Sequence, residues 1–219
     1  MDEFLKQLRD SHSDFQQDPL SDDAKKFNPL DLFKKWYKEA FDKECVEPNA
    51  MTLSTVNQKG MPSSRVIYLK ELNDDGFVFF TNYNSEKGQD ISENPQVSLI
   101  FFWEKLSRVV RIQGIAEKTT AEVSDEYFNS RPRESQLGAW ASEQSEIIPN
   151  RESLEDAVRK AEEKFQNQVV PRPPHWGGYV IQPLYIEFWQ GQPSRLHDRI
   201  CFQRENINDI EWKVNRKNP

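Results

Sequence analysis

The chain has 219 residues, which fits one large domain, or one domain with helical attachments, around a sizeable core. Its net charge of −7 argues against a nucleic-acid surface, and no apolar run is long enough to span a membrane. Aromatic residues make up 12% of the chain and charged residues 30%, which is typical of a polar surface over an aromatic core rather than of a disordered chain.

The N-terminus and the cysteines indicate a cytoplasmic protein. Residues 1–6 have neither the basic nor the apolar region of a secretory signal. Cys45 and Cys201 are far apart and neither has a second cysteine at CxxC spacing, so we expect two free thiols in a reducing compartment. No metal site is expected, because metal-ligand spacing is absent among the histidines His12, His175 and His197.

Helical signals begin after a polar N-terminal segment. Residues 1–27 lack sustained periodicity, and we expect a mobile arm there, followed by a single domain over 28–219. Asn28 and Pro29 predict the start of an amphipathic helix that ends near Lys43. Further helices are expected at 86–93, at 135–142 and after Asn150. Another is expected to start at a capping box formed by Thr119 and Glu122 and to end near residue 131.

Short runs between these helices predict strands joined mostly by hairpins. They lie at 51–56, 63–71, 77–81, 96–103, 107–118, 178–189, 199–204 and 210–214. Seven or eight such strands with inserted helices indicate a mainly β, α+β fold built on an antiparallel barrel. The glycine-rich strand–helix turn of dinucleotide-binding folds is absent from the sequence.

The stretch 187–199, EFWQGQPSRLHDR, gathers groups suited to a flat, anionic ligand. Arg195, His197 and Arg199 recur every second residue, so in an extended segment they would share one face. Guanidinium forks fit phosphate or carboxylate, and an imidazole exchanges protons near neutral pH. The same pattern also fits a barrel strand whose arginines pair with acids at the rim.

Two other segments carry polar groups that a barrel does not need for folding. Arg65 and Lys70 flank an apolar strand with opposite parity, so one of them must lie at the strand end or past a bulge. Tyr127 and Arg131 are four residues apart on a predicted helix, and Ser135 follows near the start of the next, where backbone N–H groups can hold an anion. These three predict a phosphate grip or, equally, a helix-end ion pair.

These motifs resemble those of the pyridoxine/pyridoxamine 5′-phosphate oxidase family, over about residues 30–214. The most specific pieces are 187–199, 127–135, GAWAS with the following QS at 138–145, and HWGG at 175–178. The resemblance implies an antiparallel split β-barrel of the FMN-binding type. It also implies a homodimer that binds FMN across the subunit interface.

The resemblance further implies roles for individual residues. Those implied to bind the flavin are Arg65, Val66, Ile67, Tyr68, Phe80, Thr81, Lys87, Gln144, Ser145, Trp189 and Arg199. Those implied to bind the substrate are Lys70, Tyr127, Arg131, Ser135, Arg195 and His197, of which the last two are also the expected catalytic residues.

The implied reaction oxidises pyridoxamine 5′-phosphate and pyridoxine 5′-phosphate to pyridoxal 5′-phosphate, with dioxygen as electron acceptor and hydrogen peroxide as product. Glu86 and Val109 depart from the family pattern, where Arg and Gln are usual. They motivate an alternative function, a non-catalytic pyridoxal phosphate-binding paralogue with weakened flavin binding. A third hypothesis, another flavin reductase on the same barrel, is disfavoured by the predicted phosphate grip.

Overall fold

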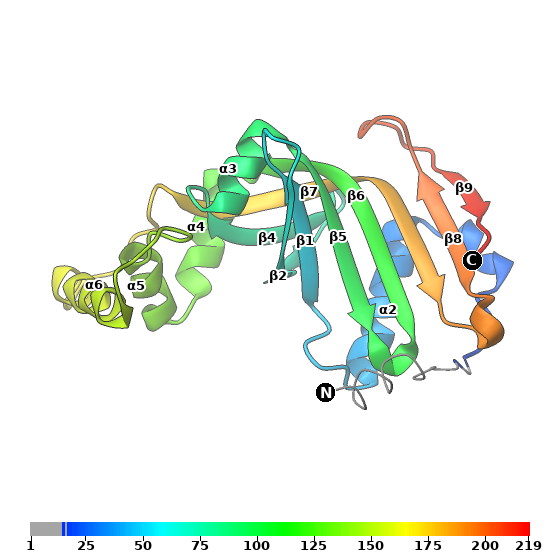
Figure 1. Cartoon of the computed structure of the whole chain (residues 1–219), viewed down its shortest axis with the longest axis horizontal. Coiled ribbons are helices and arrows are strands. Elements are labelled where there is room, and N and C mark those ends of the chain that lie inside the picture. The colour runs from blue at the N-terminus through cyan, green and yellow to red at the C-terminus, as the bar shows by residue number, and fades with distance from the viewer. Residues whose placement is uncertain (1–14, 16) are drawn as a thin grey trace, which may run out of the picture. The chain divides into compact units, whose positions relative to one another are not determined.

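The computed structural model describes residue 15 and residues 17–219, and it is drawn in Figure 1. The mobile arm predicted for 1–27 falls largely on residues 1–14 and 16, which lie outside the described residues. In the described part of that segment, Asp22–Lys26 form a 3-10 helix, η1, whose N-cap Ser21 accepts a hydrogen bond from the Asp23 N–H. The mobility of the arm stays a prediction.

The chain divides into two compact units. The terminal unit holds the described residues up to Pro48 together with residues 101–111 and 185–219. The central unit holds residues 49–100 and 112–184. No helix in the described part of the chain combines the length and the apolar character needed to cross a membrane.

The described residues form nine strands in one sheet, in the order β2-β1-β5-β6-β7-β4-β3, with β8 paired to β7 and β9 to β8. The strands are β1 Ala50–Val56, β2 Pro62–Tyr68, β3 Glu71–Leu72, β4 Phe77–Asn82, β5 Gln96–Trp103, β6 Arg108–Lys118, β7 Trp176–Gln190, β8 Asp198–Gln203 and β9 Lys213–Arg216. The β1–β2, β4–β7 and β7–β8 pairs are antiparallel, as expected for hairpin-rich β architecture. β5, β6 and β7 each run through both units.

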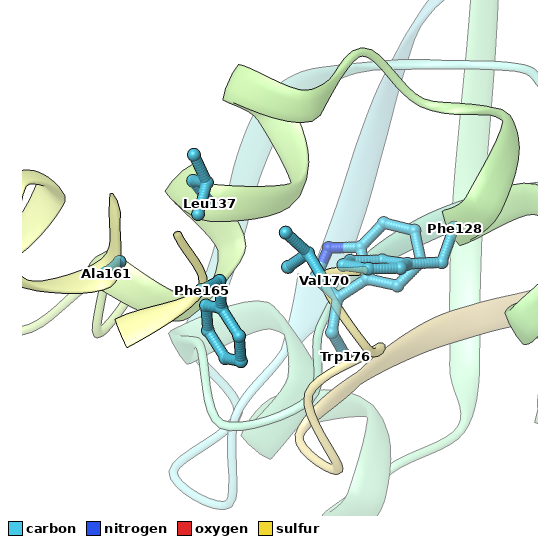
Figure 2. Close-up of a cluster of buried hydrophobic side chains, with 6 residues drawn as sticks. All are labelled: Phe128, Leu137, Ala161, Phe165, Val170 and Trp176. Carbon is cyan, nitrogen blue, oxygen red and sulfur yellow. The ribbon is translucent and has the colours of Figure 1, made fainter. Parts of the chain in front are cut away.

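Four helices belong to the central unit: α3 Glu86–Glu93, α4 Ala121–Ser130, α5 Arg133–Ala141 and α6 Arg151–Lys164. Figure 2 shows the apolar cluster that joins several of them, made of Phe128, Leu137, Ala161, Phe165, Val170 and Trp176. Phe128 and Trp176 meet edge to face at 5.2 Å, a favourable aromatic geometry. This cluster fixes the two helices that the sequence associates with a phosphate, α4 and α5.

The terminal unit is organised around α2, Pro29–Asp42, which Asn28 caps as predicted. Its aromatic stripe is core rather than ligand site, because Phe33 and Trp36 are buried. Phe33 packs on Phe101 at 4.9 Å, and Trp36 packs edge to face on Phe188 at 5.1 Å. Two short 3-10 helices complete this unit, η2 Glu104–Leu106 and η3 Pro193–Arg195.

Several element boundaries differ from those expected. The N-cap of α4 is Thr120, which accepts from the Val123 N–H, while the hydroxyl of Thr119 pairs with Ser124. The helix expected at 135–142 begins two residues earlier, at Arg133, behind an N-cap proline. The strand expected at 63–71 is split into β2 and β3, and the last strand covers 213–216 rather than 210–214.

Gly88 holds α3 close to the preceding loop, which gives a testable result for stability. A Cβ at this position would lie 2.1 Å from the backbone oxygen of Tyr83, which cannot rotate away. Gly88→Ala should therefore destabilise the fold by about 2 kcal/mol, the usual cost of overpacking. Gly138→Ala is the control, because nothing lies within 4 Å of its Cβ. Urea unfolding measures both, and equal stability of the two variants would contradict the expectation.

Candidate functional site

The central unit contains two pockets that share a wall. Pocket A, about 490 Å³, is lined by Ser63, Ser64, Arg65, Val66, Ile67, Tyr68, Lys70, Phe80, Thr81, Glu86, Lys87, Gln144 and Ser145. Pocket B, about 650 Å³, is lined by Tyr68, Lys70, Phe80, Thr81, Asn82, Tyr127, Arg131, Pro132, Ser135, Gly138, Ala139, Ser142, Gln144 and Trp176. Tyr68, Lys70, Phe80, Thr81 and Gln144 line both. The predicted flavin and substrate residues of this unit therefore gather in two adjoining spaces.

Pocket A contains two cations held by neutral partners. Arg65, on β2, donates from Nη1 to the Thr55 hydroxyl at 2.7 Å and from Nη2 to the Ser63 hydroxyl at 2.9 Å. Lys87, near the start of α3, is only 8% exposed and donates to the Ser85 hydroxyl and, at 3.0 Å, to Gln144 Oε1. Two cations without a directly paired acid among the described residues make a pocket suited to a phosphate.

The buried position of Lys87 weakens its hold on a proton. Desolvation, and then the nearby charge of Arg65, lower the pKa of Lys87 to about 8, while Glu86 acts in the opposite direction. The charge of an anion bound in pocket A would oppose both effects and raise the pKa of Lys87. Gln144 ties the loop after α5 to this point, because its Oε1 also accepts from the Thr81 hydroxyl at 3.2 Å.

Pocket B contains a stack of three parallel rings. Tyr127 lies on Phe80 with ring centroids 4.0 Å apart, and Trp176 is nearly parallel to both. The guanidinium of Arg131 lies over Trp176 at 4.6 Å. Its Nη1 is buried and has no hydrogen-bond partner among the described residues, and desolvation lowers the pKa of Arg131. Ser135, in the first turn of α5, lines the same pocket.

The parity argument about Arg65 and Lys70 is confirmed. Arg65 lies within β2, whereas Lys70 lies past its end, between β2 and β3, and lines both pockets. Arg131 departs slightly from expectation, because it is the C-cap of α4 with an extended backbone rather than a helical residue. It nevertheless lines pocket B together with Tyr127.

The four remaining predicted residues, Trp189, Arg195, His197 and Arg199, belong to the terminal unit. The expected arrangement of Arg195, His197 and Arg199 on one face of an extended segment was wrong. Residues 193–195 form the 3-10 turn η3, and both Ser194 and Arg195 have a left-handed backbone, with φ of 56° and 62°. Of these three residues only Arg199 lies on a strand, β8. Gly191 and Pro193 start a turn, so the alternation of Arg195, His197 and Arg199 does not place their side chains on one face.

The side chains of His197 and Arg199 have defined partners. His197 Nδ1 accepts from the Gln192 N–H at 3.1 Å, so a neutral imidazole carries its proton on Nε2. Its ring lies 4.6 Å from Trp189. Arg199 binds Glu187 through both oxygens, at 3.3 Å and 2.8 Å. The pairing of arginine with an acid, left open from the sequence, therefore applies to Arg199.

Some residues of these sites were missed by sequence reasoning. The ion pair of Glu187, which is 1% exposed, was one of them. Its signal in the sequence is a carboxylate between two apolar strand residues, which indicates a buried ion pair. The motif HWGG does not reveal that Trp176 lies beneath the guanidinium of Arg131. Thr55 and Asp90 carried no signal, because the contacts of Thr55 with Arg65 and with Asp90 depend on tertiary packing.

Comparison with known proteins gives a consistent result. Residues 37–165 match the family model described as pyridoxamine 5′-phosphate oxidase, and residues 176–219 match the pyridoxine 5′-phosphate oxidase C-terminal dimerisation region. A relative from Cyanothece sp., named pyridoxine/pyridoxamine 5′-phosphate oxidase, is 47% identical over 97% of this chain and 98% of its own length. A relative of the same name from Polynucleobacter asymbioticus is 49% identical over 98% and 99%.

Solved structures agree on the fold. PhzG from Burkholderia lata, in complex with tetrahydrophenazine-1-carboxylic acid, has a TM-score of 0.85 and 29% identity over 94% of this chain and all of its own. An FMN-binding protein from Nostoc punctiforme related to pyridoxamine 5′-phosphate oxidase has a TM-score of 0.69 and 15% identity, over 88% and 99%. The second likeness concerns the fold alone. The predicted antiparallel split β-barrel with helices is confirmed.

Pocket A fits the cofactor of such proteins. Arg65 and Lys87 provide cationic donors, and Lys87 is a desolvated cation that a phosphate would stabilise. Aromatic Tyr68 and Phe80 line the wall that the pocket shares with pocket B. FMN, with a phosphate at one end and a flat ring at the other, matches this set of residues. The chain belongs to the pyridoxamine 5′-phosphate oxidase family of FMN-dependent oxidoreductases.

Proposed function

We propose that this protein oxidises pyridoxamine 5′-phosphate and pyridoxine 5′-phosphate to pyridoxal 5′-phosphate, with dioxygen as electron acceptor and hydrogen peroxide as product. Arg131 is the observation that carries the proposal. Its guanidinium lies on Trp176, and its Nη1 is buried without a hydrogen-bond partner among the described residues. An anion bound here would stabilise this partly desolvated cation.

The other groups of pocket B support a phosphate rather than a carboxylate. Tyr127, Ser135 and Lys70 line it with hydroxyl and ammonium donors, and the first turn of α5 adds backbone N–H groups. A phosphate has enough oxygens to accept from all of them at once. Gly138 and Ala139 leave space beside these donors. Pocket B therefore suits a small ring that carries a phosphate.

FMN supplies the redox chemistry when it is bound, by accepting a hydride and passing the electrons to dioxygen. The chain's own residues bind and orient. Arg65 and Lys87 hold the cofactor phosphate in pocket A, and the side chains shared by both pockets place the substrate against the cofactor. We propose that Arg195 and His197 orient the substrate ring and its reacting substituent. We propose Trp189 and Arg199 as further flavin contacts.

The match of residues 176–219 to a dimerisation region supports a homodimer, and we propose that FMN lies across its subunit interface. Light scattering at low micromolar concentration should therefore give twice the mass of one chain. A monomer that keeps its flavin and full activity would contradict this part of the proposal.

The non-catalytic alternative rests on Glu86 and Val109. Glu86 lines pocket A, but its charge favours the protonated form of Lys87, so it partly offsets the desolvation of that lysine. The visible spectrum of purified protein separates the two functions. Flavin absorbance, with hydrogen peroxide released on adding pyridoxine 5′-phosphate in air, supports the oxidase. Pyridoxal absorbance alone, without peroxide, would support the alternative.

Flavin affinity should depend on pH through Lys87. Its pKa in the ligand-free protein is about 8, so the ammonium that pairs with a dianionic phosphate is present at pH 7 and largely lost at pH 9. We expect FMN to bind about tenfold more weakly at pH 9 than at pH 7, because the protonated fraction of Lys87 falls by about that factor. Quenching of FMN fluorescence on titration with apoprotein measures this.

The matched control for the pH dependence is Lys87→Arg, whose side chain stays charged throughout this range. Its FMN affinity should be nearly the same at pH 7 and pH 9. A wild-type profile as flat as that of Lys87→Arg would show that the charge of Lys87 does not contribute to cofactor binding.

A further inference from the structure

We propose that Thr55 and Asp90 are positioning residues, which hold the guanidinium of Arg65 in pocket A through a buried chain of hydrogen bonds so that it meets the cofactor phosphate. The chain runs from Arg65 through the Thr55 hydroxyl to the Asp90 carboxylate. The inference rests on the proposed function in one respect, namely that Arg65 contacts a phosphate of FMN. Neither Thr55 nor Asp90 lines either pocket.

Three different elements bring these residues together. Thr55 lies on β1 opposite Ser63 of β2, and Arg65 follows two residues later on β2. Asp90 lies on α3, one turn after Lys87. The Thr55 hydroxyl is 2.7 Å from Arg65 Nη1 and 2.6 Å from Asp90 Oδ2. Thr55 is 0% exposed and Asp90 5%, so water does not compete for these bonds.

The donors and acceptors allow only one direction along this chain. A guanidinium can only donate and an ionised carboxylate can only accept, so the hydroxyl accepts from Arg65 and donates to Asp90. A buried carboxylate is costly unless it is hydrogen-bonded, which ties Asp90 to the hydroxyl. The hydroxyl oxygen is thereby held in one place, and Arg65 Nη1 is held with it.

The intervening hydroxyl has a consequence that a direct ion pair would not have. A carboxylate bound directly to arginine typically takes one whole edge of the guanidinium in a bidentate pair. Among the described residues no acid forms such a pair with Arg65, whose other bonds go to Ser63 and to the Leu53 backbone oxygen. Asp90 therefore orients Arg65 without neutralising it by direct contact. Because α3 also carries Lys87, the same hydrogen bonds link Arg65 to the helix of a second cation of pocket A.

The test compares two ligands on apoprotein of the Thr55→Val variant. Valine keeps the size of threonine but removes the hydroxyl. Removing this charge-assisted bond should weaken FMN about tenfold, while riboflavin, which has no phosphate, should bind as it does to wild type. Thr52→Val, on the same strand, is the control, and it should change neither affinity. Thermal unfolding confirms that each variant is folded.

A double-mutant cycle with Arg65→Ala separates positioning from a general structural role. If Thr55 acts through Arg65, Thr55→Val should add no further loss of FMN affinity in the Arg65→Ala background. Asp90→Asn should weaken FMN but not riboflavin. Losses from Thr55→Val and Arg65→Ala that simply add, or equal losses for FMN and riboflavin, would overturn the proposal.

These measurements need binding only, so they are independent of catalysis. A wild-type protein that binds FMN but does not oxidise pyridoxine 5′-phosphate would contradict the proposed function and leave this test intact. A wild-type protein that binds FMN no better than riboflavin would overturn the inference, because no phosphate contact would then exist for Arg65 to make.

Discussion

Replacing Arg131 with alanine should lower kcat/KM for pyridoxine 5′-phosphate by about 100- to 1,000-fold, or ~3–4 kcal/mol, the usual cost of removing a charged partner from a desolvated site. The guanidinium is the one cation of pocket B with a buried nitrogen that lacks a partner among the described residues. Its loss also leaves the substrate phosphate facing the apolar ring of Trp176, which the guanidinium would no longer cover. Steady-state kinetics over a wide range of substrate concentration measures the effect.

FMN affinity is the internal control for this variant, because Arg131 lines pocket B and not pocket A. Arg159→Ala is the matched control for loss of charge, since Arg159 is an exposed arginine of α6 paired with Asp156. Both FMN binding by Arg131→Ala and catalysis by Arg159→Ala should stay at the wild-type level. Catalytic efficiency of Arg131→Ala within twofold of wild type would remove Arg131 from the substrate site.

Arg195→Ala should lower kcat/KM while FMN stays bound, because the proposed contact is to the substrate. The expected loss of transition-state stabilisation is ~2–4 kcal/mol. Arg195 is exposed, and no ion pair involves it among the described residues. Its backbone is left-handed, with φ of 62°, a conformation that costs about 1 kcal/mol or more for a residue with a Cβ. An arginine kept at such a position is consistent with a functional requirement for its side chain.

Glycine at position 195 separates these two properties. Arg195→Gly should be more stable than Arg195→Ala, because glycine adopts the left-handed backbone without strain. Both variants should lose the same catalytic efficiency, because both lack the guanidinium. Urea unfolding and steady-state kinetics on the same samples test this, and unchanged efficiency in either variant would contradict a substrate contact by Arg195.

Much of the site was predictable where local rules determine the structure. The parity of a strand required either Arg65 or Lys70 to lie at the strand end or past a bulge, and Lys70 lies beyond the end of β2. The break at Pro132 placed Ser135 in the first turn of a helix, near Tyr127 and Arg131. Helix caps and hairpin signals located the elements because their hydrogen bonds join residues that are close in sequence.

The failures have a common cause in contacts between distant segments. The acid that pairs with Arg199 was not identifiable from the sequence, because Glu187, which accepts from both Nε and Nη2, lies on the neighbouring strand. The turn at 193–195 followed from backbone angles that the alternation of Arg195 and His197 did not reveal. Thr55 and Asp90 are 35 residues apart, and only the packing of α3 against β1 brings them into contact.

The wall shared by pockets A and B has a thermodynamic consequence. Because Tyr68, Lys70, Phe80, Thr81 and Gln144 line both, a ligand in either pocket changes the surroundings of the other. Such coupling is reciprocal, so any factor by which bound pyridoxal 5′-phosphate changes the dissociation constant of FMN is also the factor by which FMN changes that of pyridoxal 5′-phosphate. If pyridoxal 5′-phosphate is the product, as proposed, cofactor retention during dilution or dialysis should depend on how much of it stays bound.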